Sequence, residues 1–168
     1  MIIKGTKEES AVIRWVQKAL SKDSERPVLG SLLVQKESIV ACDSHRLHAA
    51  QRPEALVDID EGMYTGKVPA GQFIAELETE DNGTYPRYQD RVPNGEPVFE
   101  IALDPKYLIE ALSYFQTPGI RFRFFGPDKP MEIIGKSKSD GSMYVLLMPR
   151  RLTDADHDSH WRPDQDRE

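Results

Sequence analysis

Residues 41–49 read Ala41-Cys42-Asp43-Ser44-His45-Arg46-Leu47-His48-Ala49, and the rest of the chain is organised around this stretch. Two further stretches share its character: Tyr85-Pro86-Arg87-Tyr88-Gln89-Asp90-Arg91-Val92-Pro93 and Tyr144-Val145-Leu146-Leu147-Met148-Pro149-Arg150-Arg151-Leu152. Each mixes apolar side chains with Arg, His or Pro, and none has the pattern of a catalytic nucleophile, a metal cage or a phosphate loop. Such a mixture is typical of a pocket wall that holds the apolar anchor of another protein.

The composition indicates a soluble protein of one domain, or of one domain with a tail. A chain of 168 residues is long enough to bury roughly two-thirds of its unfolded surface. The formal net charge of −6 argues against non-specific wrapping of nucleic acid, but not against a local basic patch. Cys42 is the single cysteine, so the sequence allows no intrachain disulfide.

The sequence shows neither a secretory signal nor an apolar run near the ~20 residues that a membrane span needs. We therefore expect a cytoplasmic protein without a membrane partner.

The first elements are a strand and a helix with a basic face. Residues 1–4 favour a strand, and Thr6 followed by Glu9 predicts a capping box at a helix start. The expected apolar face of this helix consists of Val12, Trp15, Val16, Ala19 and Leu20. The opposite face carries Lys7, Arg14, Lys18 and Lys22. That basic stripe is either a solvated face or a face turned toward a phosphate backbone.

The middle of the chain predicts strands at 28–34 and 39–50, the second of which holds the opening stretch. Residues 51–63 are acidic and broken by proline, so we expect a loop or a weak strand. Residues 70–77 space Phe73, Ile74 and Leu77 as a short helix would.

The second half repeats the opening order of elements. A strand is expected at 98–103, and Asp104 followed by Pro105 predicts the start of a second helix. Further strands are expected at residues 120–124, 131–135 and 143–148.

Both ends therefore follow the plan strand, helix, antiparallel strands, which indicates a diverged internal repeat. We predict an α+β fold in which the helices cover one face of the sheets, with a single domain over 1–152. The repeats would span about 1–60 and 98–152 and be joined by 61–97. Residues 153–168 are acidic and lack apolar periodicity, so we expect a disordered tail.

The three stretches, in this order, resemble the signatures of the bacterial and phage DNA polymerase III beta subunit family, the sliding clamps. The family pattern close to Thr-Asp-(Gly/Ser)-His-Arg-Leu-Ala is matched by residues 42–48, and Arg26-Pro27-Val28-Leu29 resembles the lead-in to it. A pattern close to Phe-Pro-x-Tyr-x-x-(Val/Leu)-(Leu/Ile)-Pro is matched by Tyr85, Pro86, Tyr88, Val92 and Pro93. The family's chain end, close to Tyr-Val-(Val/Ile)-Met-Pro-(Met/Val)-(Arg/Lys)-Leu, is matched by Tyr144, Val145, Leu147, Met148, Pro149, Arg151 and Leu152.

This resemblance implies a clamp-like domain, a non-enzymatic role in DNA replication and no cofactor or metal. Family members form rings around duplex DNA and bind short apolar peptides of polymerases and other proteins, so duplex DNA, such peptides and further copies of the chain are the implied partners. The implied peptide pocket comprises Leu29, Cys42, Ser44, His45, Arg46, Leu47, Pro86, Val92, Leu147, Met148, Pro149, Arg151 and Leu152. The implied DNA-facing residues are Lys7, Arg14, Lys18, Lys22 and Lys106.

Two departures from the family bear on function. Full-length family subunits carry more domains, so this chain resembles a condensed version. Arg91 and Arg150 stand where the family tends to have apolar residues, which predicts a more cationic pocket.

Other functions remain as alternatives. One is a clamp-like adaptor or regulator that binds the same peptides without encircling DNA. Another is a small hydrolase using Asp43, Ser44 or His45, although neighbours on a strand point to opposite faces. His157 and His160 among the aspartates of the tail are a weaker metal-binding hypothesis. Phe122 and Phe124, which alternate with arginines, suit a core-facing strand better than a surface that stacks nucleic-acid bases.

Overall fold

The computed structural model describes residues 1–151 apart from 24, 94, 114, 116–118 and 137–140. The predicted tail at 153–168 lies outside the described residues, as do His157 and His160. The chain divides into two compact units, Met1–Pro93 and Asn94–His160, and each is described by itself. The predicted bounds of the single domain and of its two repeats stay predictions.

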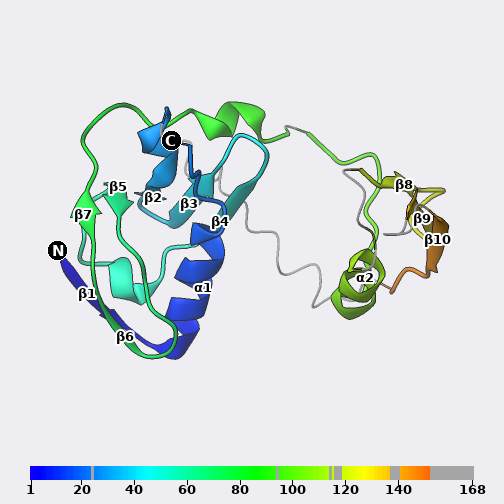
Figure 1. Ribbon diagram of the computed structural model, residues 1–168, viewed down its shortest axis with the longest axis horizontal. Helices are drawn as coiled ribbons and strands as arrows, with labels where there is room; N and C mark the ends of the chain where they lie inside the picture. The colour runs from blue at the N-terminus through cyan, green and yellow to red at the C-terminus, as the bar shows by residue number, and fades with distance from the viewer. Residues whose placement is uncertain (24, 94, 114, 116–118, 137–140, 152–168) are drawn as a thin grey trace. The chain divides into compact units, whose positions relative to one another are not determined.

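Unit 1 holds two antiparallel sheets (Figure 1). Strand β1 (Ile2–Gly5) pairs with β6 (Phe73–Glu76). The larger sheet has the order β4-β3-β2-β5-β7. Its strands are β2 (Leu32–Val34), β3 (Ser38–Cys42), β4 (Leu47–Gln51), β5 (Gly62–Thr65) and β7 (Glu78–Thr79). The short 3-10 helices of unit 1 are η1 (Pro27–Gly30), η2 (Glu54–Leu56) and η3 (Tyr88–Arg91).

Helix α1 (Lys7–Gln17) starts as the sequence predicts. Oγ1 of Thr6 accepts from the Glu9 backbone N–H (3.2 Å), and the Glu9 carboxylate accepts from the Thr6 N–H (2.8 Å). These two bonds form the capping box and satisfy two backbone donors that the first turn leaves open.

The buried face of α1 differs from the predicted one. Val16 and Ala19 are buried as expected, but Ile13 joins them, whereas Val12 and Trp15 are 38% and 46% exposed. Ile13 therefore lies at the centre of the buried stripe. The predicted apolar face includes Val12 and Trp15, which lie at the exposed edge of that stripe. The stripe packs on β3 and β4 and contributes to the main apolar core of unit 1.

Three predicted elements of unit 1 were wrong in whole or in part. Residues 28–34 are not one strand, because η1 occupies Pro27–Gly30 and β2 begins only at Leu32. Residues 39–50 are not one strand: β3 and β4 form a hairpin, and the chain reverses at 43–46. Residues 70–77 are not a helix, because β6 runs through them. Phe73 and Ala75 are buried while Ile74 is 66% exposed, which is the alternation of a strand with one buried face.

Unit 2 holds helix α2 (Pro105–Leu112) and a sheet of order β10-β9-β8. The predicted cap is confirmed, because the Asp104 carboxylate accepts from the Lys106 N–H at 2.8 Å. The strands are β8 (Arg121–Arg123), β9 (Met131–Lys136) and β10 (Ser142–Leu147). The strand expected at 98–103 is reduced to a single bridge between Ala102 and Arg150.

The described elements confirm an α+β fold built from antiparallel strands. None of the described helices has the length and apolar character to cross a bilayer.

Candidate functional site

The turn at 43–46 is built by its own first residue. One carboxylate oxygen of Asp43 accepts from the backbone N–H groups of His45 (3.1 Å) and Arg46 (3.2 Å). The other accepts from Nε of Arg46 at 3.0 Å. Ser44 takes a positive φ of 73°, which the short side chain tolerates in so tight a turn. The signature stretch is thus a braced hairpin turn rather than the predicted continuous strand.

The charge on Asp43 is stabilised by the same contacts. Burial acts to raise the pKa of this carboxyl, but the hydrogen bonds from His45 and Arg46 outweigh it and lower the pKa. Asp43 is therefore an anion at neutral pH, fixed on the guanidinium of Arg46.

A concavity of about 800 Å³ opens beside this turn, and we name it the hairpin pocket. It is formed where β3, the turn and β4 meet the segment around η3. Seven of the thirteen predicted peptide-binding residues line it: Cys42, Ser44, His45, Arg46, Leu47, Pro86 and Val92. Two of the three signature stretches therefore meet at one surface, although about forty residues separate them in sequence.

Two buried tyrosines, Tyr85 and Tyr88, adjoin the hairpin pocket, and Tyr88 is one of its lining residues. Tyr85 and Tyr88 cluster with Val40, and Leu47 and Val92 pack against that cluster. The Tyr85 hydroxyl donates to Sγ of Cys42 (3.5 Å), and the Tyr88 hydroxyl donates to Oε1 of Gln35 (2.5 Å). Burial raises the pKa of Tyr85, so its hydroxyl stays protonated and available as a donor.

Sequence reasoning missed part of the rim, because Arg87 and Asp90 also line the hairpin pocket. Arg91, which the sequence predicts to make the pocket more cationic, lines it as well. Nε of Arg87 lies 3.9 Å from a carboxylate oxygen of Asp90, an exposed pair that contributes little stability. The signal for all three was their position inside the second signature stretch.

The remaining predicted pocket residues lie elsewhere. Leu29 is buried in unit 1 and does not line the hairpin pocket, which corrects its expected place in the wall. Leu147, Met148, Pro149 and Arg151 belong to unit 2, where Met148 is 68% exposed. Leu152 lies outside the described residues.

The predicted DNA-facing residues are all exposed: Lys7, Arg14, Lys18, Lys22 and Lys106. Lys7 and Arg14 lie on α1, Lys18 caps its C-terminal end, Lys22 follows it, and Lys106 lies on α2 of unit 2. Trp15 stands among the basic residues of α1 and stacks on His48 of β4, with ring centroids 4.5 Å apart.

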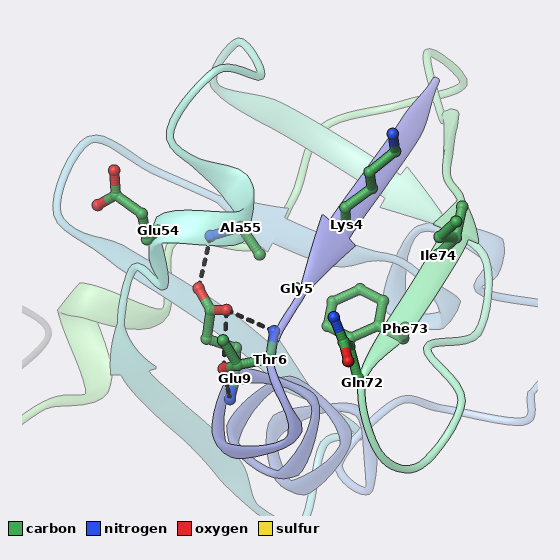
Figure 2. Close-up of a pocket in the computed structure, with 9 residues that line it drawn as sticks. All are labelled: Lys4, Gly5, Thr6, Glu9, Glu54, Ala55, Gln72, Phe73 and Ile74. Carbon is green, nitrogen blue, oxygen red and sulfur yellow. Dashed lines mark hydrogen bonds between the residues drawn. The ribbon is translucent and has the colours of Figure 1, made fainter.

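A further concavity of about 800 Å³ lies at the start of α1, between β1, η2 and β6 (Figure 2). Its most conspicuous polar group, the Glu9 carboxylate, is already engaged by Thr6 and by the Ala55 N–H at 2.7 Å. The backbone hydrogen bond from Thr6 is the largest influence that lowers the pKa of Glu9. This carboxylate therefore stabilises the fold.

The described residues offer a hydrolase little support. Oγ of Ser44 accepts from the Arg26 guanidinium at 3.1 Å, and Asp43 is held by Arg46. Asp43, Ser44 and His45 lie in the turn between β3 and β4, so the alternation of side chains along a strand does not separate them as the sequence predicts. Within the described ranges, no group of three metal-ligating side chains comes together.

The fold and the signatures agree with known proteins. Residues 67–151 match the family model described as DNA polymerase III beta subunit, C-terminal domain. No curated protein sequence matches the chain significantly.

Among solved structures, the beta sliding clamp of C. crescentus superposes with a TM-score of 0.64 at 16% identity, covering 88% of this chain and 50% of that one. The DNA polymerase sliding clamp of Bacillus subtilis gives 0.59 at 16% identity, covering 90% and 50%. The sliding clamp of Bartonella birtlesii bound to griselimycin gives 0.59 at 13% identity, covering 90% and 52%. This chain thus spans about half the length of these clamps, and at such identities the likeness concerns the fold.

Proposed function

This chain belongs to the DNA polymerase III beta subunit family, and we propose that it is a non-catalytic, clamp-like protein of DNA replication that binds short apolar peptides of polymerases and related proteins. The observation that carries the proposal is the hairpin pocket, where two signature stretches form one concave, apolar and cation-rimmed surface.

The hairpin pocket has the chemistry that such a peptide needs. Leu47, Pro86 and Val92 offer apolar walls, and burying one Leu or Phe side chain against them would contribute about 1.5–3 kcal/mol. Arg46, Arg87 and Arg91 stand at the edge, where guanidinium groups can hold peptide carbonyls or carboxylates.

The third signature stretch belongs to unit 2 and is proposed separately as a peptide contact. Leu147, Met148, Pro149, Arg151 and Leu152 remain proposed peptide contacts, and methionine suits a surface that accepts several partners.

For DNA, we propose that Lys7, Arg14, Lys18, Lys22 and Lys106 face the phosphates of a duplex held inside a ring of several copies. A ring retains DNA by topology, so a few exposed lysines and arginines are sufficient and do not prevent sliding. The net charge of −6 favours a second candidate, an adaptor that binds the peptides but does not encircle DNA. Retention on circular DNA, which is lost when the circle is cut, distinguishes the clamp from the adaptor.

Fluorescence polarisation tests the peptide-binding proposal. A labelled peptide with an adjacent Leu-Phe pair is titrated with the wild type, with Leu47→Ala and with Lys36→Ala as a matched exposed control. We expect Leu47→Ala to weaken binding about tenfold, because it removes an apolar wall, and the control to bind as the wild type does. Equal affinity for all three proteins, or none for the wild type, would contradict the proposal.

A further inference from the structure

A second concavity lies on the other side of the hairpin turn. Its volume is about 1290 Å³, and we name it the basic pocket. The C-terminal end of α1, the segment that leads to η1, the hairpin turn and Lys67 form its walls. Its ionisable lining residues are Lys18, Lys22, Asp23, Arg26, Asp43, His45, Arg46 and Lys67.

The basic pocket is positive although the chain as a whole is acidic. Five Lys or Arg side chains face two aspartates, and both aspartates are engaged. Asp43 is paired with Arg46, and a carboxylate oxygen of Asp23 accepts from the Glu25 N–H at 2.9 Å. Among the described residues, Lys18, Lys22 and Lys67 take part in no ion pair. The concavity therefore attracts anions.

Two guanidinium groups in this wall are held in place before any ligand arrives. A terminal nitrogen of Arg46 donates to the Lys18 carbonyl at 2.5 Å, and one of Arg26 donates to Oγ of Ser44 at 3.1 Å. Each guanidinium retains further N–H donors. A guanidinium group held in one orientation can donate two N–H groups to one carboxylate, and it loses little conformational entropy when it does so.

The two pockets share one wall. Ser44, His45 and Arg46 line both the hairpin pocket and the basic pocket. A peptide whose apolar anchor fills the hairpin pocket needs to continue only over this turn to reach the basic pocket.

We propose that the basic pocket binds a run of acidic residues adjoining the apolar anchor of the same peptide. The inference rests on the proposed function, and it adds a charge requirement that selects among apolar peptides. An acidic segment of the peptide would be the complement of the lysines and arginines that line the basic pocket beside the hairpin pocket.

The shape of the basic pocket favours a peptide over duplex DNA. A duplex is a stiff rod that presents its phosphates on a convex surface, so it is best met by exposed side chains such as Lys7 and Arg14. Lys18 and Lys22 line the basic pocket and also belong to the proposed DNA-facing set, so peptide and duplex would compete for them. A flexible acidic segment can instead enter a concavity and approach fixed guanidiniums from several sides. Binding of nucleic acid to the basic pocket is the competing outcome of the test.

The test compares four labelled peptides by fluorescence polarisation. One carries the Leu-Phe anchor alone, two carry three glutamates before or after it, and the fourth carries glutamines at the better of these positions. We expect the glutamate version to bind about tenfold more tightly than the glutamine version at about 50 mM salt. This advantage should disappear at about 500 mM salt, where the Debye length falls below the span of the pocket.

Charge-reversed variants locate the effect. In Lys67→Glu, which changes a lining lysine outside the proposed DNA-facing set, the advantage of glutamate should be largely lost, while the anchor peptide binds as before. Lys36→Glu, an exposed change outside both pockets, should keep the advantage. All three proteins are also titrated with a short duplex.

The result that would contradict the proposed function differs from the results that would contradict the inference. If the anchor peptide does not bind the wild type, the proposed function fails and the inference falls with it. If the anchor binds but neither glutamate peptide binds more tightly than the glutamine peptide, the inference is overturned and the proposed function stands. Loss of duplex binding in Lys67→Glu, with the glutamate advantage intact, would assign the basic pocket to nucleic acid and overturn the inference.

Discussion

At the scale of single residues, Asp43 determines how the signature stretch folds. Its carboxylate holds the two N–H groups of the turn and the side chain of Arg46, which in turn reaches the end of α1. One side chain thus links the wall shared by both pockets to the helix. Its role in this protein is structural, although its neighbours Ser44 and His45 have the residue types of a hydrolytic triad.

Asp43 makes stability depend on pH in a predictable direction. Its pKa in the folded protein lies below the ordinary value of 3.8, so its contribution is fully present above that value and is lost as the pH falls through the folded pKa. We expect urea midpoints of the wild type to exceed those of Asp43→Ala by a constant margin from about pH 8 to about pH 5, and the margin to shrink below about pH 4.

The comparison with the variant is needed because the pKa of Glu9 is also lowered and its loss would coincide. Glu9 is present in both proteins, so the margin between them isolates Asp43. A margin that is unchanged down to the lowest pH would show that the carboxylate charge does not brace the turn.

At the scale of elements, α1 joins the core to the candidate site through two different faces. Its buried face holds Ile13 and Val16, while Trp15 turns out to stack on His48 of β4. The carbonyl of Lys18 at its end anchors Arg46. A change in the packing of α1 would therefore move a wall of the basic pocket.

Two substitutions test which face of α1 is buried. We expect Ile13→Ala to lower the free energy of unfolding by about 2–5 kcal/mol, because Ile13 is fully buried and its loss leaves a cavity. Val12→Ala, on the exposed edge, should cost less than about 1 kcal/mol. Urea denaturation monitored by circular dichroism measures both values, and equal losses would place the buried stripe where the sequence pattern put it.

Local chemistry decided which elements were predictable. The starts of α1 and α2 were predicted correctly because Thr6 with Glu9, and Asp104 with Pro105, satisfy the first helical turn by themselves. The hairpin was missed because apolar residues continue on both sides of the turn at 43–46, so the sequence looks like one uninterrupted strand. Strand β6 was missed because Phe73, Ile74 and Leu77 also fit a helix, and pairing with distant β1 decides the outcome.

The same distinction applies to the site. Leu47, Pro86 and Val92 could be named in advance because they belong to signature stretches. The basic pocket could not, because Arg26 and Lys67 come from separate segments that only the tertiary fold brings together. Leu29 was assigned to the wall from its position in the sequence, but its side chain turned to the interior.

At the scale of the whole molecule, the chain consists of two compact units and spans about half the length of the clamps it superposes on. A single copy of this length is too short to surround a duplex, so any ring must be made from several copies or with other chains. Self-association is therefore the property on which a ring made of this chain alone depends.

Size-exclusion chromatography with light scattering tests this property. We expect a discrete oligomer at high protein concentration, with a mass that is a whole multiple of the monomer mass. A strict monomer at every concentration would remove the homo-oligomeric ring.

The central claim is that the hairpin pocket receives the apolar anchor of a peptide. Amide chemical shifts of the isotope-labelled protein, recorded while the unlabelled Leu-Phe peptide is added, test it most directly. We expect the resonances of Arg46, Leu47, Arg91 and Val92 to shift together and to saturate with one affinity. Saturable binding that leaves these four unchanged while other residues shift would contradict it.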